Sequence, residues 1–170
     1  MNKDANIILI GMPAAGKSTV GRILARDLGF VFMDTDSLIE QGEGRKLHEI
    51  IAGQGMDGFR NIEEAHVLGI RTEGAVIATG GSVVYGQRAM AHLKRLGTVI
   101  YLRAGLDLLL QRLDDPEKRG VVRKKGQSFA SLFDERNALY LKYADCVVEC
   151  LDSENPRATA DRVMQALTGI

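Results

Sequence analysis

The sequence has few cysteines and no tryptophan. Its two cysteines, Cys146 and Cys150, stand four positions apart in an apolar run. In a strand, four residues at about 3.3 Å each would separate them by about 13 Å, which is too far for a disulfide bond. No further ligands stand near them at the spacing of a zinc site. We therefore predict that both are small core side chains.

Net charge and long apolar runs are also absent. The 22 basic and 22 acidic residues cancel, so no global cationic field draws the chain to nucleic acid or to an anionic membrane. The aromatic residues lack the basic interleaving of a nucleic-acid platform. No apolar stretch reaches the roughly 20 residues that span a bilayer, and the start lacks the regions of a signal peptide. We predict a cytoplasmic monomer that binds neither nucleic acid nor membranes.

The length of 170 residues predicts a single domain over residues 1–170. Short apolar runs alternate with longer segments of helical period, which is typical of βαβ units around a parallel sheet. The predicted strands are Ile7–Ile10, Phe30–Met33, Ala75–Ala78, Thr98–Leu102 and Cys146–Val148. The predicted helices are Lys17–Leu28, Gly58–Arg71, Gln87–Arg95, Leu106–Leu113, Phe129–Lys142 and Pro156–Leu167.

The segment from Asp114 to Gln127, DDPEKRGVVRKKGQ, differs in composition from the rest of the chain. It is dense in charge and glycine, and few of its residues could anchor it to a core. We predict a mobile loop here. A solvated connection without a function is the alternative.

The strongest signal is Gly11 to Ser18, GMPAAGKS, which matches the phosphate-loop pattern GxxxxGK[ST] between a predicted strand and a predicted helix. Gly11 and Gly16 allow a tight turn whose amide groups point at phosphate oxygens. Lys17 can then reach the β and γ phosphates of a nucleotide, and the Ser18 hydroxyl can bind Mg²⁺. The pattern thus predicts a nucleotide site.

A phosphate loop alone does not separate a metabolite kinase from an ATPase, a GTPase switch or a nucleotide-sensing module. A Ras-type GTPase should carry an Asn-Lys-x-Asp motif late in the chain. The Asn-Lys of this chain, Asn2-Lys3, precedes the first predicted strand and lacks the aspartate. A switch GTPase is therefore disfavoured.

Two carboxylates, Asp34 and Asp36, follow the second predicted strand, where open α/β sheets bind their ligands. They share a face if the strand continues, and diverge toward a metal and an acceptor if the chain turns. A carboxylate beside an acceptor hydroxyl could orient it and take its proton. Alternatively, Asp36 is the N-cap of a helix over Ser37–Gln41.

Two further pairs of residues are candidates for an acceptor site. Arg60 and Glu63 lie on one face of a predicted helix, where an ordinary surface ion pair is the alternative. Gly80 and Gly81 end the third predicted strand, where paired glycines let a ligand approach the backbone. A simple turn is equally economical there.

The order of these segments resembles the shikimate kinase family. GMPAAGKSTVGR, FMDTD, GFRNIE, VIATGG and ERNALY follow one another at the family's spacing, and the match runs almost end to end. The resemblance implies a three-layer α/β/α P-loop kinase fold, in which a five-stranded parallel sheet has the order 2-3-1-4-5. It also implies transfer of phosphate from ATP, with Mg²⁺, to the 3-hydroxyl of shikimate, a small anionic substrate.

By position, the resemblance implies the roles of individual residues. Lys17 and Arg119 act on the phosphates, Ser18 and Asp34 serve the metal, and a lid over about 114–127 closes on the site. The residues implied to bind ATP are Gly11, Ala14, Ala15, Gly16, Lys17, Ser18, Thr19, Arg112, Arg119 and Pro156.

The acceptor-binding region implied by the resemblance spans about 34–63, with further residues later in the chain. Asp36 is the implied base, and the forks of Arg60 and Arg136 bind the substrate carboxylate. Gly81, with Gly80, donates backbone hydrogen bonds to the ligand, and Glu63 supports Arg60 or a ring hydroxyl.

Two positions depart from the family pattern. Gly120 replaces a proline after Arg119, which loosens the lid and leaves either Arg119 or Arg123 to meet the phosphates. Ser82 stands where the family has a third glycine, so it adds a side chain beside the acceptor pocket. Two alternatives therefore stay open: a kinase of gluconate or another small hydroxy acid, and a nucleotide-binding regulatory module.

Overall fold

The computed structural model describes residues 5–113, 126–151 and 155–169. Five parallel strands form one sheet in the order β2-β3-β1-β4-β5, so the predicted fold class and sheet order are confirmed. The strands are β1 (Asn6–Ile10), β2 (Val31–Asp34), β3 (Ala75–Ala78), β4 (Gly97–Ala104) and β5 (Cys146–Cys150). Each predicted strand corresponds to one of these, and no strand end differs from its prediction by more than two residues.

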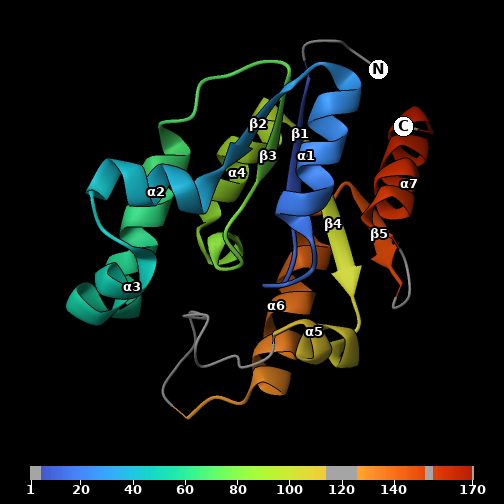
Figure 1. The fold of residues 1–170 in the computed structure, drawn as a ribbon. Coiled ribbons are helices and arrows are strands. Elements are labelled where there is room, and N and C mark those ends of the chain that lie inside the picture. Colours follow the sequence, from blue (N-terminus) through green and yellow to red (C-terminus); the bar gives the residue numbers. More distant parts are fainter. Residues whose placement is uncertain (1–4, 114–125, 152–154, 170) are drawn as a thin grey trace.

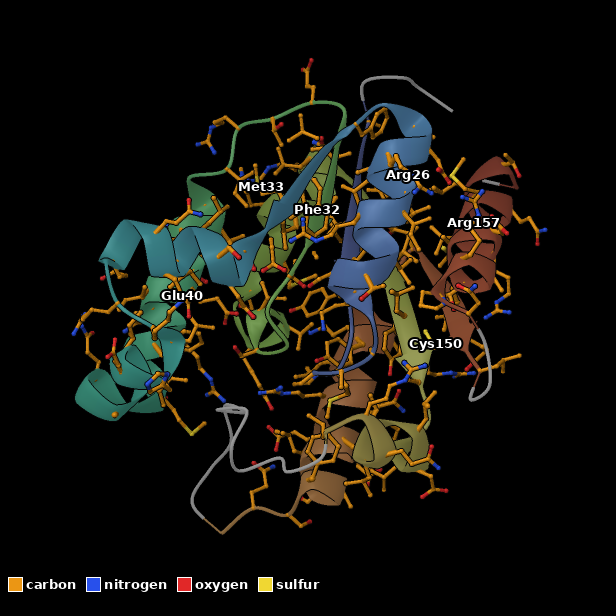
Figure 2. The ribbon with its side chains drawn as sticks, viewed as in Figure 1. Arg26, Phe32, Met33, Glu40, Cys150 and Arg157 are labelled. Atoms are coloured by element: carbon orange, nitrogen blue, oxygen red, sulfur yellow. The ribbon has the colours of Figure 1, made fainter. Side chains whose placement is uncertain are left out.

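Helices cover both faces of this sheet, with α1 in front of it and α4 behind it in Figure 1. The helices are α1 (Lys17–Leu28), α2 (Thr35–Glu43), α3 (Leu47–Leu68), α4 (Gln87–Leu96), α5 (Leu106–Leu113), α6 (Phe129–Tyr143) and α7 (Pro156–Thr168), with a short 3-10 helix η1 (Val83–Tyr85). An ion pair of 2.6 Å between Arg157 and Asp27 ties α7 to α1. Figure 2 shows Arg157 on the side of α7 that faces α1.

The main core lies around the two central strands. Every residue of β1 and β3 is buried, as expected for parallel strands covered on both faces. The edge strand β2 is more open, and its Val31 is 61% exposed. Cys150 is buried in this core and Cys146 packs against it, and both are free thiols. No helix of the described ranges is long and apolar enough to cross a membrane.

The predicted helix over Gly58–Arg71 was wrong at both ends, because α3 runs from Leu47 to Leu68. The first part was missed because its glycines argue against a helix, and the chain does leave helical geometry at Gly55, where φ is 69°. A second, small core compensates: Ile39 of α2 packs with Ile50 and Phe59 of α3. This cluster fixes α2 against α3, the two helices that make up most of the predicted acceptor region of about 34–63.

Candidate active site

The phosphate loop connects β1 to α1 and depends on its glycines. Gly11 and Gly16 have φ of 147° and 98°, and a Cβ at Gly11 would lie 2.7 Å from the carbonyl oxygen of Leu102. Gly16 is the N-cap residue of α1, and no side chain caps the first N–H groups of this helix. The first amides of α1 therefore face the loop, where the positive end of the helix favours an anion.

Lys17 is buried behind this loop. Its Nζ donates hydrogen bonds of 2.8 Å to the carbonyl oxygens of Gly11 and Met12. Burial lowers the pKa of Lys17 to about 8, and Arg136 adds to this effect, while Asp36 and Asp34 oppose it. With this pKa Lys17 is still mostly protonated at neutral pH, and nearby phosphate oxygens would raise its pKa again.

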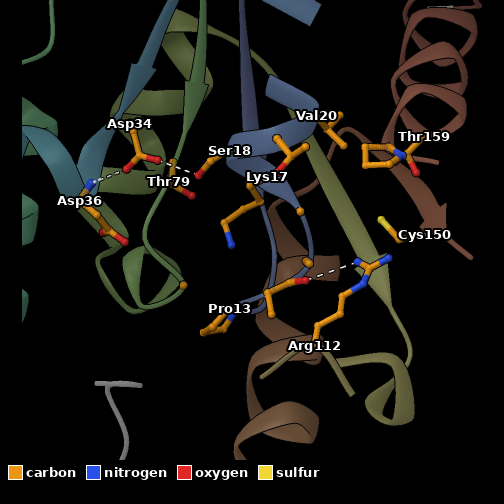
Figure 3. A pocket seen from close by; sticks show the side chains of 16 residues that line it. Pro13, Lys17, Ser18, Val20, Asp34, Asp36, Thr79, Arg112, Cys150 and Thr159 are labelled. Atoms are coloured by element: carbon orange, nitrogen blue, oxygen red, sulfur yellow. Dashed lines mark hydrogen bonds between the residues drawn. The ribbon is translucent and has the colours of Figure 1, made fainter. Parts of the chain in front are cut away.

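Asp34 and Asp36 diverge because the chain turns into α2 directly after Asp34 (Figure 3). Asp34, not Asp36, is the N-cap: its Oδ1 accepts from the N–H groups of Asp36 at 3.1 Å and Ser37 at 3.4 Å. The alternative that made Asp36 the cap of a helix over Ser37–Gln41 was therefore wrong, since the helix begins two residues earlier, at Thr35. The Asp36 carboxylate does not cap the helix and lines the cavity instead.

Burial raises the pKa of Asp36 to about 6. The neighbouring Asp34 carboxylate adds to this effect, whereas Lys17 opposes it. A carboxylate with a raised pKa is a better proton acceptor near neutral pH. Asp36 thus has the chemistry that a general base requires.

Ser18 and Asp34 offer oxygen atoms to a cation. Ser18 Oγ donates to Asp34 Oδ2 at 2.7 Å, at the exposed start of α1. Within residues 5–113, 126–151 and 155–169, no group of three or more His, Cys, Asp or Glu side chains could hold a metal ion. One hydroxyl and one carboxylate fit Mg²⁺ that arrives with a nucleotide, because this ion takes few protein ligands and keeps phosphate oxygens and waters.

A cavity of about 660 Å³ runs along the phosphate loop (Figure 3). It brings Arg112 and Pro156, from α5 and α7, together with the loop and with Asp34 and Asp36. The Arg112 guanidinium donates to the carbonyl oxygen of Ala14 at 3.4 Å. The predicted nucleotide residues Ala14, Ala15, Gly16, Lys17, Ser18, Thr19, Arg112 and Pro156 all line this cavity. Five lining residues were not predicted as site residues: Pro13, Val20, Thr79, Cys150 and Thr159.

The two glycines after β3 allow side chains to approach the backbone closely. A Cβ at Gly80 would lie 2.5 Å from Glu63 Oε1 and 2.6 Å from Asp36 Oδ1. At Gly81 it would lie 3.0 Å from the Arg136 guanidinium. The Gly80 N–H donates to Thr35 Oγ1 at 2.9 Å, so it is already used, contrary to the predicted bond to a ligand. Gly80 instead makes room for two carboxylates.

Arg60 and Arg136 meet over the ring of Tyr85. Their guanidinium carbons lie 4.1 Å and 5.5 Å from its centroid. Arg136 is only 1% exposed, and Arg60 pairs with Asp57 at 3.8 Å. Two cations from α3 and α6 are thus held near one aromatic ring, an arrangement that offers a pair of guanidinium groups to an anion. Tyr85 was not predicted, since a lone tyrosine in a turn carries no sequence signal.

Glu63 is not the surface partner of Arg60 that the helical spacing suggested as the alternative. It is 2% exposed, and its Oε2 accepts from the Ser82 hydroxyl at 2.7 Å. Burial raises the pKa of Glu63 to about 7, and the Ser82 hydrogen bond opposes this increase. The carboxylate therefore belongs to the interior of the acceptor side.

The lid prediction lies largely outside the described residues. Arg119, Gly120 and Arg123 belong to this part of the chain. At its described end, Gln127 Nε2 donates to Glu135 Oε2 at 2.8 Å, and Glu135 Oε1 accepts from Tyr85 at 2.7 Å. The end of the segment is thus connected to the residue beneath the two arginines.

Comparison with known proteins places this site in a family. The family model described as shikimate kinase matches residues 13–168. The shikimate kinase of Pseudomonas paraeruginosa is 38% identical over 165 residues, covering 95% of each chain, and that of Aliivibrio fischeri is 34% identical over 170 residues, covering 98% of each.

Solved structures agree with this result. The shikimate kinase of Acinetobacter baumannii, in complex with shikimate, has a TM-score of 0.88 at 31% identity, covering 97% of this chain and 93% of its own. The Aquifex aeolicus shikimate kinase has a TM-score of 0.77 at 28% identity, covering 96% of each chain. The chain therefore belongs to the shikimate kinase family, whose members are ATP-dependent kinases that act on a hydroxyl acceptor.

Proposed function

We propose that the protein transfers the γ-phosphoryl group of ATP to the 3-hydroxyl of shikimate. The observation that carries this proposal is the pairing of Arg60 and Arg136 over Tyr85. Asp36 lines the cavity along the phosphate loop and lies against Gly80, while Arg136 lies against the adjacent Gly81. An acceptor carboxylate bound by two arginines would bring one of the acceptor's hydroxyls toward Asp36 and the nucleotide.

On the nucleotide side, the loop amides and Lys17 would hold the β and γ phosphates. Ser18 and Asp34 would hold Mg²⁺, which when bound neutralises charge on the phosphates. Arg112 and Pro156 would flank the adenine at the far end of the cavity. Lid residues in 114–127, Arg119 or Arg123, would add positive charge to the phosphates and exclude water.

On the acceptor side, Asp36 would orient the hydroxyl and accept its proton. The acceptor oxygen forms its bond to the γ phosphorus as the bond between this phosphorus and the β–γ bridging oxygen breaks, which releases ADP. The raised pKa of Asp36, about 6, suits this proton transfer near neutral pH. Glu63, within the acceptor region of about 34–63, lies on the same side of Gly80 as Asp36 and would also face the acceptor.

A coupled ADP-release assay tests this function. MgATP is supplied with shikimate, with gluconate, or with no acceptor. We expect release that depends on shikimate and exceeds both other reactions. Release with gluconate instead would identify a kinase of another hydroxy acid. Tight ATP binding without release for any acid would identify a nucleotide-binding regulatory module.

A further inference from the structure

Ser82 is the residue of the acceptor side that departs from the family pattern, and the structure gives its side chain a partner. Ser82 precedes η1 and is 3% exposed. Its hydroxyl donates to Oε2 of Glu63, in the C-terminal part of α3, at 2.7 Å. The backbone at Ser82 has φ of −90°, which any residue adopts, so this position does not require glycine. The backbone therefore tolerates a side chain at position 82, and the Ser82 side chain makes a hydrogen bond.

The other oxygen of the same carboxylate is unpaired. Among the described residues, Glu63 Oε1 is a buried atom with no hydrogen-bond partner. It lies against Gly80, on the same side as Asp36 Oδ1. A buried carboxylate oxygen without a partner destabilises a folded protein, so such an atom calls for a ligand. A hydroxyl donor in this space would satisfy it.

We propose that Ser82 is a positioning residue, which holds the Glu63 carboxylate so that Oε1 accepts a hydrogen bond from a non-reacting hydroxyl of the acceptor. This inference rests on the proposed function. The Ser82 hydroxyl occupies Oε2 and thereby fixes the rotation of the carboxylate. Because it donates, it also favours the ionised form that accepts from a substrate hydroxyl. The acceptor class is therefore a carboxylate with at least two hydroxyls.

Several charged groups act on Glu63 besides Ser82. Asp36, from α2, raises the pKa of Glu63, whereas Arg136 of α6 and Arg60 of α3 lower it. Burial has the largest effect and raises the pKa. Loss of the Ser82 hydroxyl would leave burial and Asp36 less opposed, and Glu63 would hold its proton to higher pH.

The test compares Ser82→Ala with Ser82→Gly, which removes the same hydroxyl in a different way, and with the exposed control Ser131→Ala. We expect the KM for shikimate to rise about three- to tenfold in both Ser82 variants, which is the value of one hydrogen bond. The KM for ATP should not change. The acid limb of kcat/KM should move to higher pH.

Deoxy analogues of shikimate distinguish a positioning role of Ser82 from a general effect of its substitution on the fold. With wild-type enzyme, one of 4-deoxyshikimate and 5-deoxyshikimate should lose kcat/KM because Glu63 Oε1 loses its donor. That loss should be smaller in Ser82→Ala. An equal loss in both enzymes, an unchanged shikimate KM, or a parallel rise in the KM for ATP would overturn the inference.

The carboxyl resonance of Glu63, followed by carbon NMR in the ligand-free protein, keeps the two proposals apart. If wild-type enzyme does not phosphorylate shikimate, the proposed function fails, whatever Ser82 does. If it does, but Glu63 titrates at the same pH in wild type and Ser82→Ala, then the positioning role fails and the function stands. A pKa that is higher in Ser82→Ala supports the role.

Discussion

The phosphate loop and the acceptor side are neighbours in space but are built in different ways. The loop is one stretch of eight residues, Gly11 to Ser18, and the groups it offers to a ligand are mainly backbone amides. The acceptor side gathers side chains from α2, α3, α6 and the turn before η1. A backbone site can be recognised from a contiguous motif, whereas a side-chain site exists only once the fold has formed.

The two regions also differ in where they place charge. The loop buries one cation, Lys17. The acceptor side buries Arg136 and Glu63 and raises the pKa of Asp36, chiefly by desolvation. Buried ionisable groups of this kind destabilise the folded protein, so a cluster of them at one site is expected where they act on a ligand. The comparison predicts that loop variants damage phosphate transfer, while acceptor variants mainly damage recognition.

The largest effect should come from the loop. Lys17→Met removes the charge but keeps the length of the side chain, so turnover should fall by at least about 10²- to 10³-fold, the cost of losing one charge-stabilising group. Steady-state kinetics with MgATP measure it, with the exposed Lys142→Met as the control. Turnover equal to that of the control would remove Lys17 from the phosphate site.

Asp36→Asn tests the residue that lies between the two regions. Without a base, turnover should fall by about 10²-fold or more, while ATP binding persists. The exposed Asp107→Asn is the matched control. If Asp36→Asn keeps full activity, Asp36 has a structural role at most.

Arg136→Lys tests recognition on the acceptor side. Lysine keeps the charge but lacks the planar fork, so the KM for shikimate should rise by roughly tenfold to a hundredfold, and the KM for ATP should stay the same. Arg88→Lys, in an exposed arginine of α4, is the control. A change confined to the KM for ATP would contradict the division between the two regions.

The dependence on pH should report both regions at once. In kcat/KM for shikimate, activity should fall about tenfold per pH unit below the Asp36 pKa of about 6, and in kcat/KM for ATP it should fall above the Lys17 pKa of about 8. Glu63, with a pKa of about 7, contributes to the same limb, so Asp36→Asn should lose the Asp36 component and keep a shallower fall. An acid limb of unchanged steepness in this variant would exclude Asp36 as one of its sources.

The raised pKa values of Asp36 and Glu63 also determine how the free energy of unfolding changes with pH. Between about pH 4 and the raised pKa values of Asp36 and Glu63, about 6 and about 7, the folded state binds more protons than the unfolded state. Their contribution to the free energy of unfolding therefore falls as the pH rises through this range. Thermal unfolding of wild type and Asp36→Asn should diverge in favour of the variant as the pH rises. Parallel curves would contradict the raised pKa.

The smallest effect should come from Tyr85. Tyr85→Leu removes the ring beneath Arg60 and Arg136, and the KM for shikimate should rise about two- to fivefold, as expected for a partly exposed cation–π contact. Tyr85→Phe keeps the ring and loses only the bond to Glu135, so its KM should stay near that of wild type. An equal rise in both variants would locate the effect in the hydroxyl.

Much of the fold could be predicted because its signals are local. The apolar runs of β1 and β3 are buried throughout, and the loop glycines stand where the backbone needs them. The start of α3 could not be predicted, because packing among Ile39, Ile50 and Phe59 outweighs the low helix propensity of its glycines. Tertiary packing decided that boundary.

In the candidate site, too, the local features could be predicted and the contacts between distant segments could not. The residues that the sequence predicted for the nucleotide largely line the cavity, but the helix cap offered as an alternative for Asp36 lies at Asp34, since either aspartate fits that pattern. Tyr85 was missed, and the partner of Ser82 could not be found, because both contacts join segments about 20 to 50 residues apart. The monomeric state, the cytoplasmic location and the roles of Arg119 and Arg123 stay predictions.

A crystal structure of the enzyme with shikimate and ADP would test the central claim most directly. We predict the acceptor carboxylate on the guanidinium groups of Arg60 and Arg136, one hydroxyl within hydrogen-bonding distance of Asp36, and the ADP phosphates on the loop around Lys17. A carboxylate bound elsewhere, or an Asp36 that contacts no acceptor hydroxyl, would contradict this account of the acceptor side while leaving the phosphate loop in place.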